Sequence, residues 1–516
     1  MSAMHLKNAP VLVVGAGIMG AGIAQVAAQA GHPVMLFDMR AGAAAEAKDK
    51  LASSLQALVA KGKLDADALA QTLARITPVA ALAEAAHVAV VVEAIVEKLE
   101  AKRGLFRDLE AMVGADCILA SNTSSISVTA IANGLQHPGR LVGMHFFNPV
   151  PLMKLVEVVS GLQTDRPVAD AIFALSESWG KVAVHARSTP GFIVNRIARP
   201  FYAETLALLQ EQAATPAVLD ACLRAAGFRM GPCALMDLIG HDTNFAVTQS
   251  VYEANFFDKR YQPSLVQCEM VDGGLLGRKS GQGFYRYGPA VQAPEPSAYA
   301  PAPLPAARSL CLHGRGAVAE ALHAAFSQAL AQNAEGSALG LPELRHADSD
   351  WVGLEIDGAQ LRVSDGRCAT ALGTEVSVFD LPLQAPGSRP GLQRMALAWA
   401  PSARASAQWV AQSEQWLRAL GAIPLRVADT PGLVVARTIA MLVNEASDAV
   451  HQGVCSEDAA NAAMQLGVNY PAGPLEWQQR WGTAPVVALL DRLDTHYRGE
   501  RYRVSPALRL QLWKEQ

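Results

Sequence analysis

The chain has 516 residues, more than one hydrophobic core usually organises, so we expect several domains. Apolar residues make up 51% of the sequence and charged residues 17%, a balance that excludes a chain disordered as a whole. Forty-three basic and 47 acidic residues give a formal net charge of −4. This charge offers no electrostatic reason to bind nucleic acid or an acidic membrane surface.

Seven cysteines are scattered along the chain without a CxxC pair. This pattern indicates reduced thiols in a cytoplasmic protein, and neither a disulfide framework nor a metal site. The N-terminal apolar run that ends at Ala28-Gln29-Ala30 imitates a secretory signal peptide. The same run is explained better as a nucleotide-binding strand and helix, and the other apolar runs are too short to span a bilayer.

The first predicted strand, at 11–14, runs directly into a glycine loop, Gly15-Ala16-Gly17-Ile18-Met19-Gly20, and a helix is expected to follow. Gly15 permits the tight turn, Gly17 lets the backbone approach a pyrophosphate, and Gly20 lets helix and strand pack closely. A second strand ends at Asp38, 18 residues after Gly20. A carboxylate there accepts hydrogen bonds from a ribose 2'-hydroxyl and repels a 2'-phosphate, so the order predicts a Rossmann domain that prefers NAD to NADP.

Two further apolar strands, at 88–92 and 117–120, have near-continuous Val, Ile and Leu, which is typical of a parallel sheet covered on both faces. Each is followed by polar residues: Glu93-Ala94-Ile95-Val96-Glu97-Lys98 after the first and Ser121-Asn122-Thr123-Ser124-Ser125 after the second. These segments are expected at the carboxyl edge of the sheet, where cofactors bind. A solvated loop and a helix cap are the alternatives for the two segments.

Another apolar strand ends at His145, two prolines turn the chain, and the strand that follows carries a single acid, Glu157. A carboxylate in such a strand is costly unless it finds a partner. If the second strand returns beside the first, Glu157 can accept a hydrogen bond from one imidazole nitrogen of His145 and raise the basicity of the other. The pattern therefore predicts a proton-transfer pair, with a packed histidine and an unrelated glutamate as the alternative.

The block Thr189-Pro190-Gly191-Phe192-Ile193-Val194-Asn195-Arg196 opens a stretch rich in Ala and Leu, for which we expect helices. It is echoed by Thr430-Pro431-Gly432-Leu433-Val434-Val435-Ala436-Arg437. Some forty residues later Gly231-Pro232 in the first copy is matched by Gly473-Pro474 in the second. A matching element so far downstream indicates a duplicated helical domain.

A proline-rich segment separates the two halves, and after it 309–319 starts a possible second nucleotide fold. That fold keeps Gly314 and Gly316 but has Ala319 at the third glycine position, and no acid follows at the expected distance. The predicted fold is thus an α/β Rossmann NAD-binding domain plus an all-α helical domain, then a reduced Rossmann-like domain and a second helical domain. The predicted boundaries are 1–187, 188–288, a linker at 289–307, 308–428 and 429–516.

These motifs resemble those of the L-3-hydroxyacyl-CoA dehydrogenases over about residues 9–287, from the glycine loop through His145-Phe146-Phe147-Asn148-Pro149 to Gly277-Arg278-Lys279-Ser280-Gly281. The resemblance implies NAD-dependent oxidation of an acyl-CoA substrate. It implies four catalytic residues: His145 as base, Glu157 as its partner, and Ser124 and Asn195 around the reacting oxygens. It also places Asp38, Glu93, Lys98, Asn148 and Lys279 with the three glycines near NAD, and Ser54, Lys61 and Ser124 near coenzyme A.

The whole layout resembles the long bacterial members of that family, including those that oxidise 3-hydroxyadipyl-CoA in phenylacetate catabolism; 3-hydroxybutyryl-CoA is the other candidate substrate. Ala436 stands where the first copy has Asn195, so we expect one active site per chain. A homodimer is expected. In single-copy members of the family a second subunit covers the helical domain, so the contact here can lie within the chain, between subunits, or both.

Two rival classes stay open at this point. One is a Rossmann dehydrogenase for a hydroxy acid without coenzyme A, against which the His-Phe-Phe-Asn-Pro stretch argues. The other is a non-catalytic NAD-binding protein, structural or redox-sensing, from which we would expect loss of Ser124, His145, Glu157 or Asn195. All four are present. Acyl-chain preference cannot be inferred, because residues far apart in sequence form the pocket.

Overall fold

The computed structural model describes residues 6–288, 302–333, 342–382, 392 and 394–516. The chain divides into two compact units, one of Met1–Arg196 with Gln452–Val468, and one of Ile197–His451 with Asn469–Gln516. Among the described residues, no helix is both long and apolar enough to cross a membrane. Most of the predicted linker, 289–301, lies outside the described residues, and the domain boundaries stay a prediction.

The first unit is built on an eight-stranded sheet with the order β3-β2-β1-β4-β5-β6-β7-β8. The strands from β3 to β6 are parallel, β7 is antiparallel to β6, and β8 is parallel to β7. Their bounds are β1 (Val11–Val14), β2 (Val34–Phe37), β3 (Ile76–Pro78), β4 (Val90–Glu93), β5 (Ile118–Ser121), β6 (Leu141–Phe146), β7 (Leu155–Ser160) and β8 (Val182–Arg187). The predicted Rossmann domain is confirmed.

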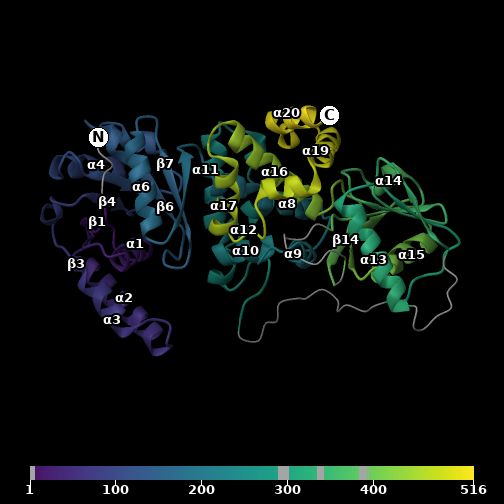
Figure 1. The fold of residues 1–516 in the computed structure, drawn as a ribbon, viewed down its shortest axis with the longest axis horizontal. Coiled ribbons are helices and arrows are strands. Elements are labelled where there is room, and N and C mark those ends of the chain that lie inside the picture. Colours follow the sequence, from purple (N-terminus) through teal and green to yellow (C-terminus); the bar gives the residue numbers. More distant parts are fainter. Residues whose placement is uncertain (1–5, 289–301, 334–341, 383–391, 393) are drawn as a thin grey trace. The chain divides into compact units, whose positions relative to one another are not determined.

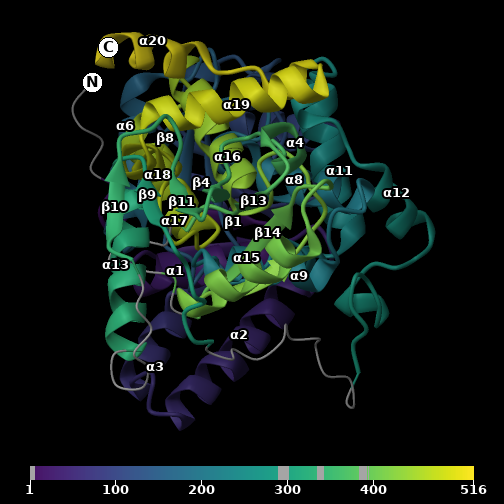
Figure 2. The same ribbon diagram turned by 90° about the vertical axis from the view of Figure 1, so that its right-hand side faces the viewer.

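Helices bury the two faces of this sheet, as its continuous apolar strands require. They are α1 (Ile18–Gln29), α4 (Leu99–Met112), α5 (Val128–Ala132) and α6 (Arg166–Ser178). Two more helices, α2 (Ala43–Ala60) and α3 (Ala66–Ala74), pair as a hairpin that projects from the sheet (Figures 1 and 2). Asp65 begins α3 by accepting hydrogen bonds from the amides of Asp67 and Ala68.

The second unit holds most of both helical copies. The first contains α8 (Arg199–Gln210), α9 (Pro216–Ala225), α10 (Pro232–Ile239), α11 (His241–Ala254) and α12 (Leu265–Asp272). The second contains α16 (Val435–His451), α18 (Pro474–Trp481), α19 (Thr483–Tyr497) and α20 (Pro506–Glu515). Helix α16 is buried almost along its whole length, between α8 and the other helices of its own copy (Figures 1 and 2). Two elements lie in the first unit instead: α17 (Glu457–Gly467) of the second copy and most of α7 (Val194–Ile197).

The second sheet has seven strands with the order β10-β9-β11-β12-β13-β14-β15. They are β9 (Leu310–His313), β10 (Leu344–Ala347), β11 (Gly353–Ile356), β12 (Ala359–Val363), β13 (Val376–Phe379), β14 (Ala396–Pro401) and β15 (Ile423–Arg426). Strands β9 and β10 are parallel and α13 (Ala317–Asn333) connects them, as in a nucleotide fold. Strand β11, however, is antiparallel to β9, whereas β4 of the first sheet is parallel to β1. The second Rossmann-like domain is therefore reduced in topology as well as in sequence.

The two copies repeat the same backbone geometry at their first residues. Gly191 and Phe192 have φ of 77° and 48°, and Gly432 and Leu433 have φ of 76° and 47°. Positive φ is strained for a residue with a side chain, so the repetition of a left-handed Phe or Leu after Gly is a specific signature. The corresponding residues lie 241 positions apart in the sequence.

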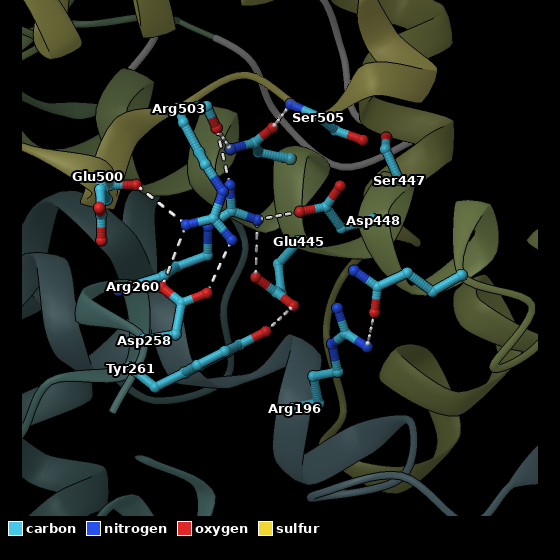
Figure 3. A network of polar contacts seen from close by, with 12 residues as sticks. Arg196, Asp258, Arg260, Tyr261, Glu445, Ser447, Asp448, Glu500, Arg503 and Ser505 are labelled. Atoms are coloured by element: carbon cyan, nitrogen blue, oxygen red, sulfur yellow. Dashed lines mark hydrogen bonds and ion pairs between the residues drawn. The ribbon is translucent and has the colours of Figure 1, made fainter. Parts of the chain in front are cut away.

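The same spacing relates two buried carboxylate clusters. Glu445 on α16 accepts hydrogen bonds from the Tyr261 hydroxyl at 2.5 Å and from Arg260 Nη1 at 3.3 Å (Figure 3). Glu204 on α8 accepts from Arg501 Nη2 at 2.9 Å and from the Tyr502 hydroxyl at 3.1 Å. Each residue of the second cluster has its counterpart in the first at 241 positions.

In these clusters Glu204 of the first copy contacts Arg501 and Tyr502 of the second, and Glu445 of the second contacts Arg260 and Tyr261 of the first. Such reciprocity is the mark of a two-fold interface. The helical copies thus pair with each other within the chain. Through this pairing, each buried glutamate receives an arginine and a tyrosine from the other copy.

The two arginines differ in how many carboxylates they pair with, which predicts unequal effects of removing either one. Arg260 also pairs with Asp448, so Arg260→Met leaves two carboxylates without this partner and should lower the free energy of unfolding by about 3 to 5 kcal/mol. Arg501→Met should cost less, because Arg437 Nε still lies 2.9 Å from Glu204 Oε2. Denaturant unfolding of both variants measures the difference, and equal losses would contradict it.

Candidate functional site

The glycine loop between β1 and α1 is shaped by close backbone contacts. Gly15 has φ of 105°, and a Cβ atom there would lie 2.4 Å from the Ala94 carbonyl oxygen. A Cβ at Gly20 would lie 1.7 Å from the Gly15 oxygen, whereas one at Gly17 would meet nothing within 4 Å. The loop is therefore tight at its two ends and open at Gly17, where the amides at the start of α1 can receive a phosphate.

Asp38 lies beside this loop at the end of β2. Its Oδ2 accepts a hydrogen bond from the Ala16 amide at 2.7 Å and its Oδ1 from the Arg40 amide at 2.9 Å. The guanidinium of Arg40 is paired with Glu46. The carboxylate is thus fixed at the loop, where a ribose would follow a bound pyrophosphate, and the residues present fit a dinucleotide.

A cleft of about 500 Å³ beside the loop collects several predicted residues. Gly17, Ser54 and Asn148 all line it, together with Arg40. Lys61 caps the C-terminus of α2 and does not line this cleft. Lys279 belongs to the second unit, where its ammonium group pairs with Asp242.

The acidic segment after β4 is arranged differently from the sequence expectation. Glu93 is fully buried, and it accepts from Lys102 Nζ at 2.6 Å, Ser121 Oγ at 2.6 Å and the Ile95 amide at 2.7 Å. Lys98 is an exposed residue at the start of α4. With its carboxylate enclosed in this way, Glu93 supports the edge of the sheet from inside and is not placed to contact a ligand.

The more accessible acid of this segment is Glu97, which the sequence reasoning did not select. Its Oε1 accepts from Thr123 Oγ1 at 2.6 Å and from the Ser124 amide at 2.9 Å, and Lys102 Nζ lies 3.2 Å from Oε2. Burial favours the neutral acid, but Lys102 and the hydrogen bonds outweigh it and hold the pKa of Glu97 below its usual value. Lys102, one helical turn after Lys98, thus links both acids, a signal visible only once the helix start is known.

Ser124 and Asn195 come together from distant parts of the sequence. The Asn195 side-chain amide donates to the Ser124 carbonyl oxygen at 3.3 Å. Asn122 lies on the same loop as Ser124 and accepts from the Phe146 amide at 2.8 Å, next to His145. Hydrogen bonds therefore connect the loop after β5 both to the end of β6 and to the start of α7.

His145 and Glu157 face each other across the antiparallel strands β6 and β7. His145 Nδ1 lies 2.6 Å from Glu157 Oε2, and the two residues are 5% and 0% exposed. The predicted hydrogen bond is confirmed. The other carboxylate oxygen accepts from the amides of Ile193 and Val194 at 3.0 and 2.9 Å.

This arrangement fixes what the imidazole can do. With Nδ1 donating its proton to a carboxylate held in place by two amides, Nε2 carries the free lone pair. Phe147 packs against the ring at a centroid distance of 4.5 Å and restricts its tilt. The pair can accept a proton at Nε2 and stabilise the resulting positive charge through Glu157.

Comparison with known proteins gives consistent matches along the chain. The model of the 3-hydroxyacyl-CoA dehydrogenase NAD binding domain matches residues 10–189, and that of the 3-hydroxyacyl-CoA dehydrogenase C-terminal domain matches 191–287 and again 432–514. The chain is 42% identical over 507 residues to the 3-hydroxyadipyl-CoA dehydrogenase of Escherichia coli, covering 98% of both proteins. It is 43% identical over 276 residues to a probable 3-hydroxybutyryl-CoA dehydrogenase of Deinococcus radiodurans, covering 53% of this chain and 99% of that protein.

A solved structure is similar over the same length. The crystal structure of a 3-hydroxybutyryl-CoA dehydrogenase from Escherichia coli K12 aligns with a TM-score of 0.86 and 39% identity, covering 99% of each chain. Both the predicted family and the second C-terminal domain are confirmed.

In the described part of the second half, the strands that correspond to β6 and β7 carry no histidine–glutamate pair. Strands β13 and β14 are antiparallel like β6 and β7; Asp380 follows directly after β13, and its amide donates to the Ala398 carbonyl of β14 at 2.8 Å. Asp380 is fully buried and accepts from the amides of Val434, Val435 and Ala436, at 2.9, 2.6 and 2.9 Å. A carboxylate here holds the start of the second helical copy without an imidazole beside it.

Asp380 predicts a pH effect on stability. Burial raises its pKa to about 6, against the lowering effect of the amide hydrogen bonds. Between about pH 4 and pH 6 the folded protein therefore binds this proton more tightly than the unfolded chain, so the free energy of unfolding should fall as pH rises through that window. In Asp380→Asn this contribution should vanish. Denaturant unfolding at several pH values measures it, and an unchanged slope would contradict the assignment.

Proposed function

The chain belongs to the 3-hydroxyacyl-CoA dehydrogenase family, and from this we propose that the His145–Glu157 pair carries its reaction. The protein is an enzyme that oxidises 3-hydroxyacyl-CoA with NAD. The observation that supports the assignment is the 2.6 Å hydrogen bond between two buried groups, with the remaining carboxylate oxygen held by two backbone amides.

In this mechanism Nε2 of His145 accepts the proton of the substrate C3 hydroxyl. Bound NAD supplies the hydride acceptor. Glu157 stabilises the imidazolium through its negative charge, because two amide hydrogen bonds to its second oxygen keep the carboxylate facing the ring. Proton loss at the hydroxyl and hydride loss at C3 together give the 3-oxoacyl product.

Ser124 and Asn195 are proposed as the polar groups around the reacting oxygens. Their mutual hydrogen bond supports a common location. Asp38, the glycine loop and Asn148 are proposed for NAD, and Ser54 for coenzyme A, supported by the shared cleft. Lys61 and Lys279 stay predictions from family resemblance. Glu97 with Lys102 is proposed in place of Glu93 and Lys98 at the cofactor edge, because Glu97 holds the Ser124 loop.

As substrate we propose 3-hydroxyadipyl-CoA, supported by the relative of that name, which matches the whole chain. The name of the similar solved structure favours 3-hydroxybutyryl-CoA as the second candidate. Measuring kcat/KM for carboxylated and uncarboxylated acyl chains of equal length decides between them. A cytoplasmic location and a homodimer stay predictions.

The pair is tested by removing each partner. His145→Gln should lower kcat by about 10²- to 10⁴-fold with little change in the Kd of NADH, since a general base is lost. Glu157→Gln should also lower kcat. The kcat of the double variant should be close to that of the less active single variant, because the two residues act as a unit. Reduction of acetoacetyl-CoA, followed at 340 nm, measures all three. Losses that multiply would show that the two residues act independently.

The preference for NAD is tested at Asp38. Asp38→Ser should relax discrimination against NADP by about 1 to 3 kcal/mol, because it removes both a repelling charge and a ribose hydrogen bond. The ratio of kcat/KM for NADH and NADPH reports the change. Equal use of both cofactors by the unaltered enzyme would refute the role given to Asp38.

A further inference from the structure

Helix α17 belongs in sequence to the second helical copy, yet it lies in the first unit. It is packed against β7, the strand that carries Glu157, and against the neighbouring strand β8. The loop before it is hydrogen-bonded to the same region: the Arg187 amide donates to the Val454 carbonyl at 2.9 Å, and Arg196 Nη1 donates to Gln452 Oε1 at 2.8 Å. A helix from the second half of the sequence therefore packs against the sheet that holds His145 and Glu157.

Gly467, the last residue of α17, lies against side chains close to the His145–Glu157 pair. A Cβ atom on Gly467 would lie 2.7 Å from Leu155 Cδ2, 3.0 Å from Val194 Cγ2 and 3.7 Å from Phe147 Cε1. The first of these distances is shorter than real Cβ contacts, and the second is tighter than most of them. A side chain at 467 must therefore displace Leu155 and press on Val194, whereas its contact with Phe147 would be an ordinary one.

Each of the three neighbours is directly connected to the pair. The Val194 amide donates to Glu157, Leu155 stands two residues before Glu157 on β7, and Phe147 packs against the imidazole of His145. Leu155 and Val194 are 0% and 2% exposed, so they have little free space to move into. Cys455 lies two residues before the start of α17. Burial raises the pKa of its thiol to about 12, and the negative charge of Glu157 raises it further.

The second unit shows the matching relation. There α9 of the first helical copy packs on β14, the strand that corresponds to β7. Each helical copy thus places one helix against the sheet of the other half. This exchange ties the two halves of the sequence together.

We propose that Gly467 is a positioning residue for the dehydrogenase reaction, through which helix α17 of the second copy sets the geometry of His145 and Glu157. The inference rests on the proposed function of that pair. The absence of a side chain at 467 lets Leu155 and Val194 take the positions in which Glu157 lies opposite His145 and receives the Val194 amide hydrogen bond.

The test uses Gly467→Ala and Gly467→Val in the full chain. Misplacing reacting groups by about 1 Å costs roughly 10²-fold in rate, so we expect kcat to fall several-fold in the alanine variant and toward roughly 10²-fold in the valine variant. The KM for the acyl-CoA and the Kd of NADH should change less than twofold. The pH profile of kcat should shift on its acidic limb, because the base is His145 and its partner has moved.

Two controls separate this role from a structural one. Gly467 is helical with φ outside the left-handed region, so alanine adds no backbone strain there, and denaturant unfolding measures separately any stability lost by displacing Leu155. Gly104→Ala in α4, where a Cβ meets nothing within 4 Å, makes the same chemical change and should leave kcat unaltered. Adding Leu155→Val to Gly467→Ala removes the bulk that alanine displaces and should restore most of kcat.

The outcomes are distinct from those for the pair itself. If His145→Gln keeps its activity, the proposed function fails. If His145→Gln is inactive but both Gly467 variants, folded by circular dichroism, keep full kcat and an unshifted pH profile, this inference is overturned. Failure of Leu155→Val to rescue Gly467→Ala would also overturn it.

Discussion

The carboxylate of Glu157 is the constraint on which the first unit depends. It is completely buried, and a charge in such a place is tolerated only when its lone pairs are satisfied. One oxygen accepts a hydrogen bond from His145 Nδ1, and the other accepts hydrogen bonds from two amides at the start of α7. These amides point at the carboxylate because Gly191 and Phe192 turn the chain through the left-handed region. Strand register, turn and helix start are thus all set by one group.

The second half meets the same requirement in another way. Its helical copy also begins after a left-handed Gly-Leu turn, and its first amides also need an acceptor. The acceptor is Asp380, which follows directly after the strand equivalent to that of His145, and its amide donates to the Ala398 carbonyl on the strand equivalent to that of Glu157. Placing the acid at the end of the neighbouring strand keeps the helix start satisfied and removes the imidazole. The need to bind the amides is therefore separable from the proton transfer that the first copy adds to it.

Local patterns were sufficient for the parts of the structure that depend on neighbouring residues. The glycine loop with Asp38, the duplication, and the opposition of His145 and Glu157 all follow from short spacings, and the structure has them. The choice between Glu93 and Glu97 did not follow, since only the end of β4 decides which acid is enclosed. The inverted β11 and the exchange of α17 were also missed, because strand direction and helix docking depend on contacts between residues far apart in sequence.

The reciprocal clusters give the second helical copy a structural role in this chain. Glu204 needs Arg501, and Arg260 needs Glu445 and Asp448, so loss of either copy would leave charges buried without their partners. Leaving such charges unpaired would lower the free energy of unfolding more than most single substitutions elsewhere in the second half. Two kinds of position in the second half meet different requirements. The buried ion pairs of α16 are needed for the pairing of the helical copies. Asp380, which follows β13, has only to accept the amides at the start of the helix that comes next. The interface between the helical copies and the acceptor at the helix start are therefore independent requirements on the second half.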